Sequence, residues 1–133
     1  MKISLITIFI ITRLISPVSK DIEERIEIQS KKEFLRHVSP EEILEYRDDV
    51  GVRHVYLFSK PTCKWCKEEE QELIRMSKEL PDVEFFVVNC NKYKEYCKKM
   101  QIFSVPTIYV FRNYVERKCF DRQYDYLKKF IMK

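Results

Sequence analysis

Two cysteines separated by two residues, Cys63 and Cys66, are the side chains in this sequence best suited to covalent chemistry. They follow Ser59-Lys60-Pro61-Thr62, between a predicted strand and a predicted helix. A cysteine at a helix N-terminus faces free backbone N–H groups and the positive end of the helix dipole, which lower the thiol pKa. The spacing allows the second sulfur to close a small disulfide ring with the first. The pattern predicts thiol–disulfide exchange, with Cys63 as the attacking thiolate and Cys66 as the resolving thiol.

The residues around this pair add to the same prediction. Lys64 lies next to Cys63, and Lys60 and Lys67 flank the pair. Positive charge stabilises a thiolate, so we expect Lys64 to tune Cys63 toward the reduced, ionised form. Trp65 is expected either to shield the site or to contact apolar parts of a substrate.

The cysteine pair has two other interpretations, half of a zinc site and a purely structural disulfide. Half of a zinc site would need a second close pair of ligands, yet Cys90 and Cys97 are too far apart in sequence, and His37 and His54 lie outside any ligand-like cluster. A purely structural role is disfavoured because such a short ring constrains little chain entropy. The sequence therefore predicts no metal.

The elements that must position the pair follow from apolar periodicity and capping residues. We expect helices at 30–38 (N-cap Ser30), from Ser39 to about Gly51, at 64–80, at 92–100 and at 123–132. Strands are expected at 54–58, 83–88, 107–111 and 115–120, with a weak edge strand at 24–29. The continuous apolar runs are typical of strands covered by helices on both faces. The fold class is therefore an α/β sandwich with a mixed central sheet.

The N-terminal segment predicts a secretory signal. Lys2 precedes an apolar run over 3–11, and small residues follow it, which favours a signal peptide over about 1–19 rather than a membrane span or a buried strand. Cleavage is expected between Ser16 and Lys20, leaving a domain over 20–133. The chain would then lie in an oxidising compartment, either the endoplasmic reticulum lumen or the extracellular space.

The length and composition of the chain limit the classes of protein to which it can belong. A chain of 133 residues with 45% hydrophobic and 35% charged residues predicts one folded domain. A net charge of +4 beside 21 acidic residues does not indicate a nucleic-acid partner. The five cysteines are an odd number, so not all of them can pair within one molecule. Cys119, in the strand expected at 115–120, is expected to be a small buried hydrophobe, the alternatives being intermolecular pairing or a regulatory thiol.

The sequence resembles the thioredoxin superfamily over residues 22–132. The resemblance rests on Cys63-Lys64-Trp65-Cys66 after a strand and on Val105-Pro106-Thr107 before a strand. It implies a three-layer α/β/α sandwich. It also implies that Pro106 follows a cis peptide bond and faces the cysteines, where Val105 would pair with an extended substrate chain. Without the resemblance, Pro106 is simply a proline at the start of a strand.

A narrower resemblance, to the catalytic domains of protein disulfide isomerases, rests on Cys90 and Cys97 before Ile102-Phe103-Ser104-Val105-Pro106. It implies a structural Cys90–Cys97 disulfide, the alternative being two free buried cysteines. It implies protein thiols or disulfides as substrates and a redox partner whose identity stays open. No cofactor, nucleic acid or lasting membrane insertion after signal cleavage is expected.

The sequence departs from the family at two positions. Leu57 stands where the family usually buries an acid, and Thr62 stands where it usually has an aromatic residue. Glu69 and Glu70 lie one turn after Cys66; either is a candidate proton acceptor, although the pattern favours a solvated turn for both. These departures leave two alternatives open: a redox-inert binding or chaperone module, and a glutaredoxin-like reductase.

Overall fold

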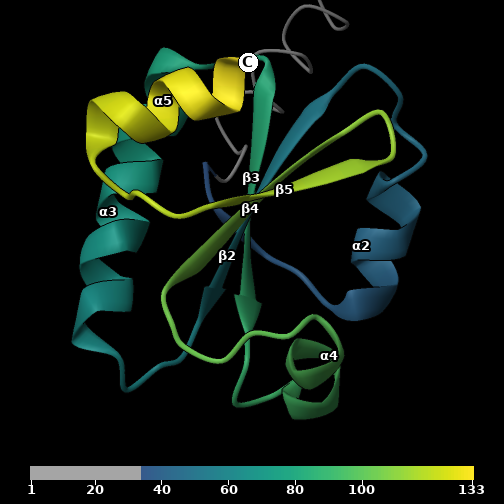
Figure 1. The fold of residues 1–133 in the computed structure, drawn as a ribbon, viewed down its shortest axis with the longest axis vertical. Helices are drawn as coiled ribbons and strands as arrows, with labels where there is room; N and C mark the ends of the chain where they lie inside the picture. Colours follow the sequence, from purple (N-terminus) through teal and green to yellow (C-terminus); the bar gives the residue numbers. More distant parts are fainter. Residues whose placement is uncertain (1–33) are drawn as a thin grey trace, which may run out of the picture. The chain divides into compact units, whose positions relative to one another are not determined.

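The computed structural model describes residues 34–133, in which five strands alternate with four helices (Figure 1). The strands are β1 (Arg36–His37), β2 (Arg53–Ser59), β3 (Val83–Asn89), β4 (Thr107–Arg112) and β5 (Val115–Cys119). The helices are α2 (Pro40–Tyr46), α3 (Lys64–Glu79), α4 (Lys94–Lys99) and α5 (Tyr124–Met132). From α2 onward, each predicted element is present and of the predicted type, although α2 and α4 are shorter than predicted. The predicted signal peptide and the weak strand at 24–29 lie outside the described residues.

The strands form one mixed sheet with the order β1-β3-β2-β4-β5. β1 and β2 both run parallel to β3, whereas β4 is antiparallel to β2 and β5 is antiparallel to β4. Figure 1 shows α3 and α5 on one face of the sheet and α2 and α4 on the other. The predicted three-layer α/β/α sandwich with a mixed sheet is therefore confirmed.

Each face of the sheet has its own hydrophobic core. On one face, Leu73 and Met76 of α3 pack with Leu127 and Ile131 of α5 against β2, β3 and β4. On the other face, the core includes residues of α2, α4 and the same strands, namely Ile43, Tyr56, Phe58, Phe86, Val88, Cys97 and Phe111. Burial of these side chains on both faces explains why the central strands lack polar alternation.

The register between β2 and β4 brings two distant segments to the same edge of the sheet. Phe58 lies opposite Thr107, close to the end of β2 and at the start of β4. Because the two strands run in opposite directions, the loop that follows β2 and the loop that precedes β4 leave the sheet at the same end. The cysteine pair and Pro106 are thus brought together by strand pairing.

The helix predicted over 30–38 is wrong for the part that the structure describes. Arg36–His37 is the edge strand β1, and the N–H of Val38 donates to the carbonyl oxygen of Val87 at 3.0 Å. Ladder hydrogen bonds to β3 satisfy this backbone, and such long-range pairing outweighs the local helix signal.

The start of α2 is as predicted, but its end is earlier. Ser39 and Glu42 form the expected capping box, in which the hydroxyl of Ser39 accepts from the N–H of Glu42 at 3.2 Å. The helix ends at Tyr46, and Gly51 lies instead in the turn before β2 with φ +89°. Its N–H donates to Oδ1 of Asn113 at 2.7 Å, in the two-residue turn that joins β4 to β5.

His54 is an unusual core residue. Its side chain is 0% exposed, and neither ring nitrogen has a hydrogen-bond partner. It is surrounded by the rings of Tyr46, Tyr56, Phe86 and Phe111. Burial lowers the pKa of His54, and this outweighs the opposing charges of Asp49 and Glu84, while Arg36 adds to the lowering. The fold therefore favours the neutral form of this imidazole over the charged form.

A pH dependence of stability follows from His54. The pKa of His54 is lower in the folded chain than the reference of about 6.5 that holds when the chain is unfolded, so the unfolded chain binds this proton first as the pH falls. Stability contributed by the neutral imidazole is therefore lost between pH 7.5 and 5.5. Urea unfolding at pH 7.5 and pH 5.5 should show that His54→Phe removes this part of the pH dependence of the free energy of unfolding. His37→Gln, a substitution at an exposed histidine, should leave that pH dependence in place. Equal pH dependence in the parent and His54→Phe would contradict the assignment.

Candidate active site

The cysteine pair lies at the start of α3, as predicted. Cys63 is the N-cap residue, and its sulfur accepts a hydrogen bond from the backbone N–H of Cys66 at 3.1 Å. The two residues are joined by a disulfide with a Cα–Cα separation of 5.2 Å. Cys66 is fully buried, whereas Cys63 is partly exposed. N–H donation at a helix N-terminus stabilises a negatively charged sulfur, so this position favours Cys63 as the thiolate that meets solvent.

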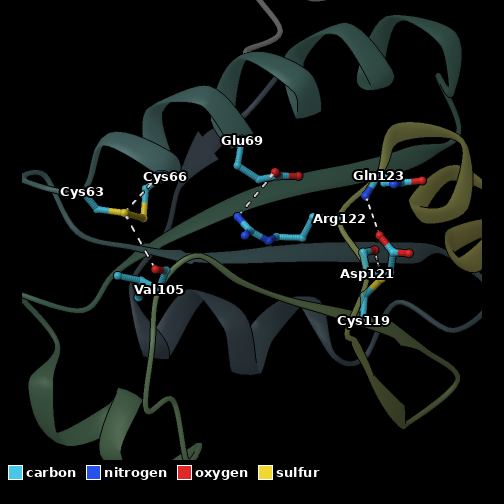
Figure 2. A network of polar contacts seen from close by, with 8 residues as sticks. All are labelled: Cys63, Cys66, Glu69, Val105, Cys119, Asp121, Arg122 and Gln123. Atoms are coloured by element: carbon cyan, nitrogen blue, oxygen red, sulfur yellow. Dashed lines mark hydrogen bonds and ion pairs between the residues drawn. A yellow bond between two sulfur atoms is a disulfide. The ribbon is translucent and has the colours of Figure 1, made fainter.

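The loop before β4 faces this disulfide from across the sheet edge. The peptide bond between Val105 and Pro106 is cis, as the resemblance implies. The carbonyl oxygen of Val105 lies 3.9 Å from Sγ of Cys63 (Figure 2). The hydroxyl of Thr107 donates to the carbonyl oxygen of Ser104 at 2.6 Å, which holds the loop in this shape. The structure thus brings Cys63, Cys66, Val105 and Pro106 together.

The two residues between the cysteines point to solvent. Trp65 is 64% exposed, and Lys64 is also exposed at the first turn of α3. An exposed indole beside a reactive sulfur offers a large apolar surface to another molecule. Trp65 is therefore accessible to another molecule, and its two predicted roles, shielding the site and contacting a substrate, stay predictions.

Cys90 and Cys97 are joined by a second disulfide, with a Cα–Cα separation of 5.7 Å. Cys90 follows β3, and its N–H donates to the carbonyl oxygen of Ser59 at 2.8 Å. Cys97 lies on α4, and its carbonyl oxygen accepts from the N–H of Ile102 at 2.9 Å. The bridge therefore ties the end of β3 to the helix that leads into the Val105–Pro106 loop.

The sequence matches the family model for thioredoxin over residues 27–133. The chain belongs to the thioredoxin family. This membership, with Cys63 and Cys66 paired at the start of α3, supports thiol–disulfide oxidoreductase chemistry in general. A search of curated proteins found no match to the sequence.

The fold of this chain is similar to the folds of several solved thioredoxin structures. Thioredoxin f2 of Chlamydomonas reinhardtii is 29% identical, with a TM-score of 0.66, over 73% of this chain and 93% of that one. Thioredoxin NaTrxh of Nicotiana alata is 18% identical, with a TM-score of 0.68, over 77% and 93% of the two chains. The J-Trx1 fragment of ERdj5 is 22% identical, with a TM-score of 0.66, and the match covers 74% of this chain and only 50% of that fragment.

The acid that the family usually buries near the second cysteine is absent at Leu57, which is fully buried in an apolar core. The structure separates the two candidate substitutes. Glu70 is partly exposed and accepts a hydrogen bond from the hydroxyl of Ser59 at 3.3 Å. Glu69 is buried, so the predicted solvated turn is wrong for this residue.

Sequence analysis did not predict a partner for Glu69, and the structure places Arg122 beside it. Arg122 lies after β5, and its Nη1 is 3.9 Å from Oε2 of Glu69 (Figure 2). No local pattern in the sequence marks this arginine, because it is far from α3 along the chain. Only the packing of the β5–α5 segment beside α3 brings it near Glu69.

Cys119, the remaining cysteine, is buried and free. Its thiol donates to the carbonyl oxygen of Asp121 at 3.0 Å. Burial raises the pKa of Cys119, which keeps the thiol protonated and unreactive at neutral pH. This agrees with the predicted role as a small core side chain.

Two further properties concern residues 34–133 alone. No group of three or more His, Cys, Asp and Glu side chains in this range is placed to hold a metal ion. Within the same range, no helix has the length and apolar character needed to cross a membrane.

The Cys90–Cys97 bridge should stabilise the fold. It closes a loop between residues seven apart in sequence, and closing a loop of this size contributes about 2.5 kcal/mol through the unfolded chain. Cys90→Ala/Cys97→Ala should lower the free energy of unfolding by about that amount in urea titrations. Exchange at Cys63 should persist at temperatures where the variant is folded. An unchanged unfolding midpoint would contradict a structural role.

Proposed function

We propose that this chain is a thiol–disulfide oxidoreductase that acts on protein substrates, resembling protein disulfide isomerase, in the secretory pathway. The observation that carries the proposal is the Cys63–Cys66 disulfide at the start of α3, with the backbone of Val105 beside the outer sulfur. The second disulfide, Cys90–Cys97, supports the isomerase-like branch. It also supports an oxidising compartment, where such bonds persist.

In the oxidising direction, a substrate thiolate attacks Sγ of Cys63 and forms a mixed disulfide. The Cys63–Cys66 bond breaks, and its electron pair leaves on Cys66, which takes up a proton. A second substrate thiolate then attacks the substrate sulfur of the mixed disulfide and releases the Cys63 thiolate. The substrate gains a disulfide, and the enzyme becomes a dithiol. The same steps run in reverse when the enzyme reduces a substrate.

The difference in exposure decides which sulfur reacts. Cys66 is fully buried beneath the first turn of α3, so a protein substrate reaches Cys63 first. The N–H of Cys66, which donates to the Cys63 sulfur, also stabilises Cys63 when it leaves as a thiolate. Cys66 is then placed to resolve the mixed disulfide from inside.

The substrate is held by backbone and by an aromatic surface. An extended segment beside Cys63 meets the carbonyl oxygen of Val105, which is a main-chain contact with little sequence preference. The exposed ring of Trp65, between the two cysteines in sequence, supplies apolar contact. This combination favours unfolded or partly folded chains as substrates.

The cysteine roles predict different behaviour for two variants. Cys63→Ser should abolish insulin reduction, because no sulfur remains that a substrate can attack. Cys66→Ser should instead accumulate the mixed disulfide, visible as a covalent adduct on non-reducing gels. If the unmodified chain is inactive although its cysteines reduce and reoxidise, the redox-inert module would replace this proposal.

The location in the secretory pathway rests on the N-terminal sequence and on the second disulfide. When the whole chain is expressed in a cell with a secretory pathway, mass spectrometry after thiol trapping should find a mature N-terminus between Ser16 and Lys20. The same spectra should find Cys90 bonded to Cys97. A chain that retains Met1 and has both cysteines reduced would contradict this location.

A further inference from the structure

Glu69 is a buried carboxylate that the exchange steps above do not use. Its residue is 7% exposed, and among residues 34–133 it is the one acidic residue in the buried class. Its Oε1 is buried without a hydrogen-bond partner, while Oε2 lies 3.9 Å from Nη1 of Arg122. A buried carboxylate with one unpartnered oxygen is unfavourable for stability, so its presence calls for a functional reason.

Glu69 and Cys66 share the buried face of α3. They are three residues apart on the helix, and side chains with this spacing lie on neighbouring turns with Cβ atoms about 5–6 Å apart. Figure 2 shows both residues on the side of α3 that faces Val105 and Arg122. The carboxylate of Glu69 leans toward Arg122, so proton transfer from Cys66 requires rotation of the Glu69 side chain or one bridging water.

The neighbouring acid does not have this placement. Glu70 is partly exposed, and its Oε1 accepts from the hydroxyl of Ser59 on β2. Leu57 of β2 supplies only hydrocarbon. Of the three positions Leu57, Glu69 and Glu70, only Glu69 therefore places a buried carboxylate on the face of α3 that carries Cys66.

We propose that Glu69 is the proton acceptor for Cys66 when the chain resolves a mixed disulfide. The inference rests on the proposed oxidoreductase function and assigns a further residue to that site. The Cys66 thiol gives its proton to the Glu69 carboxylate. The resulting thiolate attacks Sγ of Cys63, the Cys63–Cys66 bond forms, and the electron pair of the mixed disulfide leaves on the substrate sulfur. That sulfur takes a proton from solvent, and Glu69 returns its proton to solvent.

The surroundings of Glu69 make it suitable for this exchange. Burial raises the pKa of Glu69, Arg122 opposes this from the segment after β5, and Glu72 on the same helix adds to the raising. Cys119 on β5 also lies within electrostatic range of Glu69. A carboxyl with a raised pKa holds a proton more readily than a solvated one, so the proton transfer from a thiol is less uphill.

Glu69→Gln tests the role directly. The reduced protein is mixed with glutathione disulfide, samples are quenched with acid, and the decay of the Cys63–glutathione adduct is followed by mass spectrometry. Formation of the adduct should keep its parent rate, because Cys63 does not need the carboxylate. Decay should slow about 10-fold at pH 7, and the difference should shrink toward pH 9, where Cys66 loses its proton without an internal base.

Two matched variants separate proton transfer from a structural effect. Glu70→Gln removes the adjacent carboxylate and should leave adduct decay at the parent rate. Glu69→Asp keeps a carboxylate on one fewer methylene and should restore most of the decay rate. A decay rate in Glu69→Gln equal to the parent's, or a slowing that is the same at pH 7 and pH 9, would overturn the inference.

Two further outcomes keep the test decisive. If the parent forms no adduct at all, the proposed oxidoreductase function fails, independently of Glu69. If Glu69→Gln does not fold, the unmodified reduced chain is labelled with ¹³C at cysteine Cβ and titrated by NMR. The Cys66 resonance should then shift in two steps, because the thiol and the carboxyl titrate as a coupled pair. A single step would overturn the inference.

Discussion

The antiparallel pairing of β2 with β4 is the constraint on which the site depends. Because Phe58 lies opposite Thr107, the segment that carries Cys63 and the segment that carries Pro106 leave the same edge of the sheet. Cys90 joins them there, since its N–H donates to the carbonyl oxygen of Ser59. Three segments that are distant in sequence thus meet at the end of β2, and the two hydrophobic cores hold β2 and β4 at the centre of the sheet.

The five cysteines divide according to their surroundings. Cys63 and Cys66 lie at a helix N-terminus, where backbone N–H groups stabilise charge on sulfur and one sulfur meets solvent. Cys90 and Cys97 are both buried and joined, and they connect β3 to α4. Cys119 is buried without a sulfur partner, and burial holds it as a thiol. The exposure of a cysteine and its position on a helix therefore decide whether it exchanges disulfides or has a structural role.

Within residues 34–133, a histidine and a carboxylate are buried next to the hydrophobic cores, one on each face of the sheet. His54 packs among aromatic rings on the face of α2, and burial there lowers its pKa. Glu69 lies on α3 near the reactive disulfide, with a guanidinium close to one of its oxygens. Burial disfavours the charged form of both groups, so it shifts their pKa values in opposite directions. The carboxylate lies on the same helix as the Cys63–Cys66 disulfide, where exchange requires proton transfer, whereas the imidazole lies on the opposite face of the sheet.

The sequence by itself determined the elements from α2 onward and the placement of the cysteine pair at a helix start. These follow from local signals, namely the Ser39 capping box, the apolar runs of the strands and the Cys-x-x-Cys spacing. The cis bond before Pro106 and the Cys90–Cys97 bridge came from the family resemblance. Tertiary structure alone decided that Arg36–His37 is a strand, because its hydrogen-bond partners lie on β3. It also decided that Glu69 is buried and Glu70 is not, and that Arg122 lies beside Glu69. Adjacent helix positions differ by about 100° in direction, and only packing against the sheet selects the one that faces inward.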